Sequence, residues 1–398
     1  MKSRFVILII SAILLGGLMC SSFAQSPNGT RVNGFTLVVP PSSVPHPGQA
    51  HTNYVWAIPD VSRPDGPPDG TESPASLACV YGLTKGPKGC SVADSKNNPT
   101  GGWGAIGIVD AGDYPTAKED LHVFSKYFGL PEADFHKVFA DGHKPPVYSG
   151  WDVEESLDIE WAHAMAPKAK IFLIESKQVN TDPTWQAVRV AGKVVAQAGG
   201  GTVSNSWGIS EWAQETQYDK NFVHPGVVFF AASGDSGVGV ASHPAASPNV
   251  VSVGGTYFER DSNGNFIDEI YYGGGGDISP YEKIPSYQTI IKKIVGNHRG
   301  YPDVAAPFCC APIYITSYGG WGAVGGTSWS SPTMAGIVNA AGAKYKSTAD
   351  ELTAIYKEYG NKKQYKADFH DITDGDSHCT AGWDLCAGVG SPLTYKGK

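Results

Sequence analysis

The sequence predicts an α/β fold in which one large domain holds a mostly parallel β-sheet with helices on both faces. From about residue 74 onward, short apolar runs typical of buried strands alternate with helical patterns. Strand followed by helix, repeated along a chain, favours parallel strands joined by crossover helices. The chain has 398 residues, of which 41% are hydrophobic, and this is enough to form the core of such a domain.

The individual elements follow from local patterns. Buried strands are predicted at residues 106–109, 170–176, 201–208, 226–237 and 249–256. Helices are predicted from Pro115 to Gly129, at residues 151–167, from about residue 183 to 198, and from near Pro332. An Asn-Gly turn predicts a hairpin over residues 259–272. The four glycines that follow, residues 273–276, allow close approach to a packed neighbour or to an extended ligand.

Charge and composition exclude some classes of function. The formal net charge is −8, from 30 Lys and Arg against 38 Asp and Glu. No basic run is present to neutralise phosphates, so we expect no nucleic-acid partner. Only 17% of the residues are charged, which is common in secreted hydrolases.

The N-terminus predicts export. Lys2 and Arg4 precede an apolar run at residues 5–18, and small residues stand at the cleavage-site positions, so residues 1–24 are expected to be a signal peptide. The run is shorter than the ~20 residues of a membrane span, which favours a secreted protein without a membrane anchor. Residues 25–73 are rich in proline and are expected to form a leader or short pro-segment before the main domain at residues 74–398.

Six cysteines remain after removal of the signal peptide, and an even number in an exported chain favours disulfides. Close spacing favours Cys79 with Cys90, and Cys379 with Cys386. The adjacent Cys309 and Cys310 are not assigned to partners by this argument.

Candidate chemistry begins with Ser328, in the segment GGTSWSSP before the last predicted helix. Free N–H groups at a helix N-terminus favour a developing negative charge, although serine is also a preferred helix cap. None of the 11 histidines stands in a recognisable base motif. Glu154 and Asp158 are four residues apart on one face of a predicted helix. Buried beside a serine, such a pair would share a proton; on a surface, it would be two solvated carboxylates.

Several motifs resemble those of the sedolisin family of serine-carboxyl peptidases, in the family's order and spacing. The Glu-x-x-x-Asp pattern matches Glu154 and Asp158, Ser-Gly-Asp matches residues 233–235, and Gly-Thr-Ser-x-x-x-Pro matches residues 326–332. The likeness extends over about residues 79–392. It implies a subtilisin-like fold and a peptidase that acts on protein or peptide substrates.

The resemblance also implies a role for each matched residue. Ser328 would be the nucleophile, Glu154 the general base, Asp158 its partner and Asp235 the oxyanion-hole residue. Asp110 would extend the hydrogen-bond chain behind Glu154. Substrate backbone would pair with Ser206, Trp207 and Gly208, and Gly274 and Gly275 would form the opposite wall.

These residue types suit acid. A carboxylate base with a pKa of roughly 4 works where imidazole is fully protonated, and Asp235 can donate to an oxyanion only while it is protonated. We therefore expect activity to peak below about pH 5 and to fall toward neutrality.

The resemblance implies one calcium ion near the C-terminus. It would be held by the side chains of Asp371 and Asp384 and by the carbonyls of Ile372, Thr380 and Gly382, an oxygen donor set that suits calcium. Removal of the ion is expected to lower stability. The expected protein is a monomer.

Two alternatives remain. One is a non-catalytic secreted peptide-binding protein of the same fold, and the other is a glycosidase that uses Glu154 and Asp158 as acid and base. The family usually carries a long folded pro-domain, whereas this leader has only about 50 residues, too few for an ordinary domain of that kind. The motifs do not separate an endopeptidase from a tripeptidyl peptidase.

Overall fold

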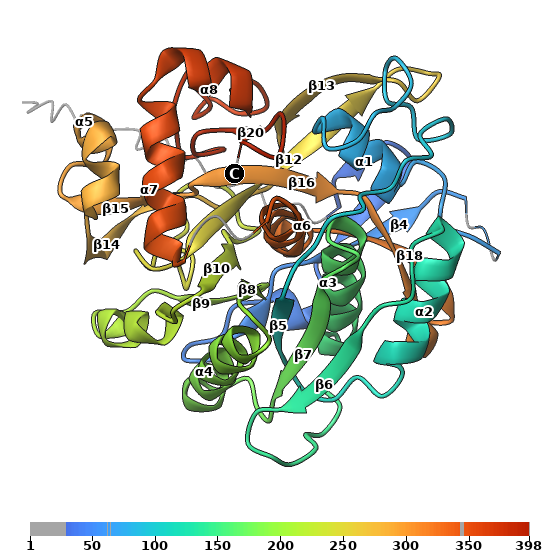
Figure 1. Ribbon diagram of the computed structural model, residues 1–398, viewed down its shortest axis with the longest axis horizontal. Coiled ribbons are helices and arrows are strands. Elements are labelled where there is room, and N and C mark those ends of the chain that lie inside the picture. The colour runs from blue at the N-terminus through green and yellow to red at the C-terminus, as the bar shows by residue number, and fades with distance from the viewer. Residues whose placement is uncertain (1–28, 62, 64, 343–345, 398) are drawn as a thin grey trace, which may run out of the picture.

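A central sheet with the strand order β13-β12-β10-β8-β5-β7-β6 organises the protein (Figure 1). The computed structural model describes residues 29–61, 63, 65–342 and 346–397, and the predicted signal peptide lies outside these ranges. The strands of this sheet are β5 (Ala105–Ala111), β6 (Phe135–Phe139), β7 (Lys170–Ser176), β8 (Gly201–Asn205), β10 (Val227–Ala232), β12 (Val251–Arg260) and β13 (Phe266–Tyr271). Their neighbours are parallel except for β12 with β13, and β16 (Val304–Cys309) pairs parallel with β12. The predicted α/β fold is confirmed.

Helices cover both faces of this sheet (Figure 1). The helices of the whole protein are α1 (Pro74–Val80), α2 (Ala117–Phe128), α3 (Trp151–Met165), α4 (Thr181–Gln197), α5 (Lys292–Val295), α6 (Thr327–Ala340), α7 (Thr348–Tyr359) and α8 (Lys362–Asp368), with 3-10 turns at Pro41–Ser43, Glu215–Phe222, Ser286–Ile291 and Thr316–Tyr318. Among them, α3, α4 and α6 pack directly on the strands of this sheet. Successive side chains of β5 point to opposite faces of the sheet. Ile106 and Ile108 therefore pack into the core formed with α3 and α6, while Val109 packs into the core formed with α4.

Residues before α1 add strands to the domain. A second sheet has the order β1-β2-β4-β18-β17, in which β1 (Arg31–Val32), β2 (Phe35–Val38) and β4 (Val55–Pro59) come from the proline-rich segment. Their partners are β17 (Ala311–Ile315) and β18 (Gly320–Gly325), and β4 lies beside β18 in Figure 1. A smaller sheet joins β3 (His51–Thr52), β9 (Trp207–Ser210) and β11 (Ser242–His243). Two further pairs are β14 (Asp277–Lys283) with β15 (His298–Tyr301), and β19 (Phe369–His370) with β20 (Ser391–Pro392).

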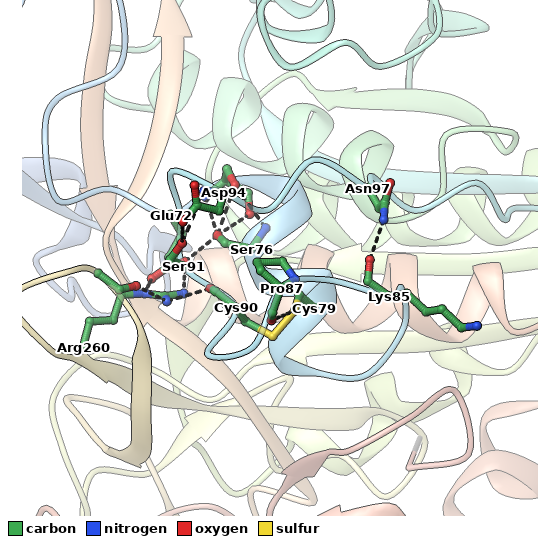
Figure 2. The surroundings of a disulfide bond; sticks show 12 residues. Glu72, Ser76, Cys79, Lys85, Pro87, Cys90, Ser91, Asp94, Asn97 and Arg260 are labelled. Atoms are coloured by element: carbon green, nitrogen blue, oxygen red, sulfur yellow. Dashed lines mark hydrogen bonds and ion pairs between the residues drawn. A yellow bond between two sulfur atoms is a disulfide. The ribbon is translucent and has the colours of Figure 1, made fainter.

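Disulfides join Cys79 to Cys90 and Cys379 to Cys386, as predicted. The structure also pairs the adjacent Cys309 and Cys310, which the sequence argument did not assign. Figure 2 shows the first of these bonds beside an ion pair between Glu72 and Arg260, whose Nε donates to Oε1 at 2.6 Å. Arg260 also donates to Cys90 O at 2.9 Å, so the hairpin of β12 and β13 is tied to the region around α1.

Several predicted boundaries are wrong. The strand predicted at residues 201–208 is divided between β8 and β9, which belong to different sheets, and β10 ends at Ala232 rather than at residue 237. The last core helix, α6, begins at Thr327 rather than near Pro332, so the proline lies inside it. Its first turn is stabilised by tertiary contacts described below, which local sequence patterns do not reveal. Within the part of the chain that the structure describes, no helix is both long enough and apolar enough to cross a membrane.

Candidate active site

Ser328, the predicted nucleophile, is the second residue of α6 and is fully buried. Its N–H, free of helical bonding, donates to Asn53 O at 3.0 Å. Pro332, four residues further along, has no N–H, so the carbonyl of Ser328 loses its usual helical donor. Ser206 Oγ, 3.3 Å away, shares its single proton between that carbonyl and Asp158 Oδ1 in a three-centre hydrogen bond. The sequence of α6 thus leaves both backbone groups of Ser328 available to other segments.

Two carboxyl side chains of α3 meet this serine. Glu154 and Asp158 are fully buried, and Asp158 Oδ1 accepts a hydrogen bond from Ser206 Oγ at 2.8 Å. Ser328 Oγ donates to Ser206 O at 3.1 Å. Burial raises the pKa of both carboxyls well above the usual range, and the charge of Asp158 raises that of Glu154 further. Neither carboxyl oxygen of Glu154 has a hydrogen-bond partner among the described residues. The pair therefore holds a proton at a pH where an exposed glutamate is ionised.

Asp110 lies in β5, buried near these carboxyls, and its charge raises the pKa of both Glu154 and Asp158. Neither of its carboxyl oxygens has a hydrogen-bond partner among the described residues. Glu175 stands directly opposite it on β7, and burial and the charge of Glu175 raise the pKa of Asp110. Sequence analysis missed Glu175, because only the strand order places it beside the other carboxyls.

Asp235 follows β10 and is fixed by the start of α6. Thr327 N and Thr327 Oγ1 both donate to Asp235 Oδ1 at 2.8 Å. The other oxygen, Oδ2, is buried without a hydrogen-bond partner in the described part of the chain. Burial raises the pKa of Asp235 to about 7, against the lowering effect of the Thr327 bonds. This carboxyl can therefore carry a proton in mild acid and present it from Oδ2.

Gly326 lies between Asn53 O and the Asp235 carboxyl and has no room for a side chain. A Cβ there would lie 2.2 Å from Asn53 O and 2.7 Å from Asp235 Oδ2, and the φ of +126° disfavours other residues. The two oxygens therefore face the same small space in front of α6.

Ser206, Trp207 and Gly208, the predicted substrate strand, form the edge of the site. Ser206 bridges the carboxyls and the serine as described above, and the other two lie in β9. The Trp207 ring packs against Trp185, with ring centroids 5.4 Å apart, and is fully buried. Trp207 therefore contributes its backbone, and not its ring, to this edge.

Gly274 and Gly275 lie close to other backbone. A Cβ on Gly274 would stand 2.3 Å from Gly255 N, and one on Gly275 would stand 2.3 Å from Ser233 O. Gly275 also lines a small pocket together with Asp235. The glycines thus serve close packing, and Gly275 lies at the edge of the site.

A stretch of the proline-rich segment enters this site, and sequence analysis did not anticipate it. Thr52 pairs with Trp207 and His51 with Gly208, in antiparallel register. Asn53 N donates to Ser206 O at 3.3 Å. The only signal available was the alternation of small and larger residues around residues 50–56, which is too short to identify a strand.

Three of the predicted calcium residues, Thr380, Gly382 and Asp384, lie in the loop closed by the Cys379–Cys386 disulfide, and Asp371 and Ile372 precede it in the chain. Asp384 Oδ2 accepts from Thr380 N at 2.6 Å, and both oxygens of Asp371 accept from Gly382 N at 3.0 Å. Ile372 is buried beside them. Burial and the charge of Asp371 raise the pKa of Asp384 to about 6. Two neighbouring carboxylates beside a loop of backbone carbonyls offer the kind of oxygen donors that calcium prefers.

A second group of buried acids lies elsewhere, and we call it the Glu215 cluster: Glu211, Glu215, Asp219, Glu282 and His243. Ligand atoms of Glu215, His243 and Glu282 lie within 4.8 Å of one another. The structure also has a cavity of about 730 Å³ beside Arg260 and Lys96, and none of the predicted site residues lines it.

Comparisons with known proteins agree with this architecture. The model of the subtilase family matches residues 152–364, more than half of the chain. Kumamolisin from Bacillus sp. (strain MN-32) is 29% identical over 286 residues, which cover 62% of this chain and 50% of kumamolisin. Sedolisin from Pseudomonas sp. (strain 101) is 24% identical over 348 residues, which cover 76% of this chain and 58% of sedolisin. The chain spans about half the length of these curated relatives.

Solved structures show the same fold. Pseudomonas sedolisin, a serine-carboxyl proteinase complexed with two molecules of pseudo-iodotyrostatin, has a TM-score of 0.65 and 22% identity, covering 81% of this chain and 95% of that one. Sphericase has a TM-score of 0.53 and 18% identity, covering 81% and 98%. The expected subtilisin-like fold and the resemblance to sedolisins are confirmed, and the chain belongs to the subtilase family.

Proposed function

We propose that this protein is a secreted, acid-acting serine-carboxyl peptidase that hydrolyses peptide bonds in proteins or peptides. One observation carries the proposal: two buried carboxyls with raised pKa values, Glu154 and Asp158, converge on Ser328 at the N-terminus of a helix. A carboxyl pair on a helix surface would be ionised and solvated. Buried beside a hydroxyl, it forms a proton-accepting and proton-storing unit.

In the proposed mechanism, Glu154 takes the proton of Ser328 Oγ as the hydroxyl attacks the substrate carbonyl carbon. Asp158 stabilises the protonated Glu154, and Ser206 Oγ fixes the orientation of Asp158 through its 2.8 Å bond. Glu154 then returns the proton to the leaving amine, which leaves an ester between Ser328 and the acyl half of the substrate. Water hydrolyses this ester by the reverse sequence of proton transfers.

The oxyanion of this reaction would be bound by Ser328 N–H and by the proton on Asp235 Oδ2. The two groups lie near each other: Asn53 O, which accepts from Ser328 N, and Asp235 Oδ2 would lie 2.2 and 2.7 Å from a Cβ placed on Gly326. Preorganised donors of this kind are usually the largest single contribution to acyl-transfer catalysis. Since Asp235 loses its proton near pH 7, we expect the rate to fall as the solution becomes neutral.

Calcium is part of the proposal as a structural ion. Asp371 and Asp384 would hold it with the carbonyls of Ile372, Thr380 and Gly382. When bound, it would neutralise the repulsion between the two carboxylates and stabilise the C-terminal loop.

The test is digestion of a denatured protein by the purified full chain from pH 3 to 8, with products identified by mass. We expect cleavage in acid that is lost in Ser328→Ala and Glu154→Ala. Thr353→Ala, on the exposed face of α7, is the matched control and should match the parent. Internal or terminal cuts would separate an endopeptidase from a tripeptidyl peptidase.

The main alternative is a peptide-binding protein without turnover, which the extended stretch in the site also fits. It predicts no cleavage by the parent at any pH and peptide binding that persists in Ser328→Ala. Cleavage that survives in Ser328→Ala would contradict the serine-carboxyl mechanism itself.

A further inference from the structure

Three side chains of the Glu215 cluster meet at one buried point, although they come from distant parts of the chain. Glu215 begins the 3-10 turn Glu215–Phe222, His243 lies in β11, and Glu282 lies in β14. One ligand atom of each lies within 4.8 Å of the other two. None of the three residues is more than 3% exposed. The fold therefore brings two carboxyls and one imidazole together away from solvent.

His243 has no hydrogen bond that would account for its place in the core. Both of its ring nitrogens are buried without a partner among the described residues. The rings of Trp185, Trp212 and Phe222 surround it, with centroids 5.3, 5.6 and 6.0 Å away. Nδ1 lies 4.0 Å from Glu215 Oε1, which is too far for a hydrogen bond. Since buried polar groups of native proteins are nearly always bonded, this imidazole requires a partner at the cluster.

The two carboxyls also have oxygens to spare. Oε1 of Glu215 and Oε1 of Glu282 are buried without a hydrogen-bond partner in the described part of the chain. The other oxygen of Glu215 accepts from Trp212 N at 2.8 Å, which fixes the side chain. The charge of Arg299 acts on Glu282, but its guanidinium is bonded to Asp303, with Nη1 and Oδ1 2.8 Å apart. Among the described residues, no Lys or Arg forms an ion pair with Glu215 or Glu282.

We propose that Glu215, His243 and Glu282 bind one Zn²⁺ ion, at a site separate from the expected calcium loop. Imidazole and carboxylate groups are usual zinc ligands, and two carboxylates would balance the charge of the ion. Burial lowers the pKa of His243 to about 3, so its imidazole is neutral, as a metal ligand must be. Calcium binds oxygen atoms, and the imidazole therefore favours zinc over calcium.

The three ligand atoms would move closer together on binding. Zinc lies about 2.0–2.2 Å from nitrogen and oxygen ligands, so the ligand atoms of a tetrahedral site are about 3.4 Å apart. Small rotations of the two glutamate side chains would bring the atoms to this spacing. The fourth ligand would be a water molecule or Glu211, whose Oε2 is also buried without a partner among the described residues.

Such an ion would join three segments behind the strand that is expected to pair with substrate. His243 stands opposite Ile209 of β9, and the other two ligands come from a 3-10 turn and from β14. We therefore expect the ion to stabilise the fold and to take no part in the peptidase chemistry. The metal-free protein holds protons on these carboxyls instead, and the pH dependence of Glu215 belongs to that form.

The test uses the full chain, stripped of metal with a chelator and then supplied with calcium to fill the C-terminal loop. Zinc chloride is added at pH 7, and unbound zinc is removed by gel filtration. Metal content is measured by mass spectrometry and Tm by calorimetry. We expect one retained zinc ion per chain and a Tm several degrees above that of the protein with calcium alone.

Variants locate the bound ion. His243→Phe keeps an aromatic ring in place but removes both nitrogens, so it should retain no zinc and show no rise in Tm with zinc. His122→Ala removes an exposed histidine that lies beside Glu132, and as the matched control it should retain zinc like the parent. If His243→Phe does not fold, Glu282→Gln answers the same question, because glutamine keeps the shape of the protonated side chain and removes a ligand.

Two outcomes would overturn the inference. A folded, calcium-loaded parent that retains no zinc would show that the cluster holds protons only. Equal retention of zinc by the parent and by a folded His243→Phe or Glu282→Gln would place the ion elsewhere on the protein. Neither outcome bears on the proposed function, because no step of this test measures cleavage.

Discussion

Two groups of buried acids differ in what surrounds them. In the Glu154 cluster, which comprises Glu154, Asp158 and Asp110, the carboxyls lie beside a serine hydroxyl and the backbone donors at the start of α6. In the Glu215 cluster, the acids bond to one another and to Ser279 and Ser247, and a buried histidine packs among aromatic rings. Carboxyls in both clusters have raised pKa values, so a raised pKa alone does not identify an active site.

The two clusters differ in the groups that lie next to their carboxyls. Burial and Glu211 raise the pKa of Glu215 to about 10, and burial lowers that of His243 to about 3. These groups remain neutral at pH 7, and Glu215, at the start of a 3-10 turn, uses Oε2 to accept a hydrogen bond from Trp212 N at 2.8 Å. In the proposed function, protons held in the Glu154 cluster act on a substrate, and we expect protons held in the Glu215 cluster to affect stability alone.

The largest effect expected is that of Ser328→Ala. Removal of the nucleophile should lower kcat/KM on a denatured protein by roughly 10⁵-fold or more, with little change in Tm. Glu215→Gln should leave kcat/KM within about twofold of the parent. A large loss of activity in Glu215→Gln, with its fold intact by circular dichroism, would erase the distinction between the clusters.

Asp235 should give the next largest effect. Asp235→Ala removes an oxyanion donor and should lower kcat by about 10²–10³-fold. Asp235→Asn keeps an acceptor for Thr327 and places an N–H where the protonated carboxyl donates, at every pH. We therefore expect Asp235→Asn to retain more activity than Asp235→Ala and to extend activity toward neutral pH. The pH profiles of the two variants check this, and identical profiles would contradict the assigned role.

A third set of carboxylates, Asp371 and Asp384, is expected to stabilise the fold by binding a metal ion and not by holding protons. Chelation tests this expectation. Excess chelator at pH 6 should lower Tm by several degrees, and added calcium should restore it. Asp384→Asn should weaken this response. An unchanged Tm in chelator would exclude a structural calcium ion at this loop.

The smallest effect concerns the Glu215 cluster and pH. Since the folded state raises the pKa of Glu215 from 4.5 to about 10, folding takes up a proton between these values. Its contribution to stability is complete below about pH 4.5 and is lost progressively as pH rises toward 10. Glu215→Gln stays neutral, so its Tm should exceed the parent's by roughly 3 °C at pH 8 and equal it at pH 4. Equal pH dependence of Tm in both proteins would show that the group titrates normally.

Sequence patterns found the central sheet because its strands are continuous apolar runs, as at residues 170–176 and 249–256. They selected Ser328, Glu154 and Asp235 as candidates because these residues stand in short motifs near helix starts and strand ends, and their catalytic roles stay predictions. They could not separate the two acid clusters, since Glu211 and Glu215 have the same spacing as Glu154 and Asp158. Burial decides between them, and burial depends on packing from distant segments.

Local sequence patterns also could not predict the start of α6 or the strands of the proline-rich segment, because both depend on contacts with distant segments. The first turn of α6 is held by Asp235 and Asn53, which are distant in sequence. Residues 50–56 show no long apolar run, and their strands exist only because β9 and β18 supply partners.

The pairing of β4 with β18 also affects the order in which the chain can fold during synthesis. Val55 and Gly325 are bonding partners, and 270 residues separate them. At synthesis rates of about 5–20 residues per second, the first strand would wait between about 15 and 55 s for its partner to be made. During that interval β4 has an open edge, which is a site for wrong pairing with other chains. The antiparallel contact of β2 with β4 forms from local sequence and covers one of its two edges early.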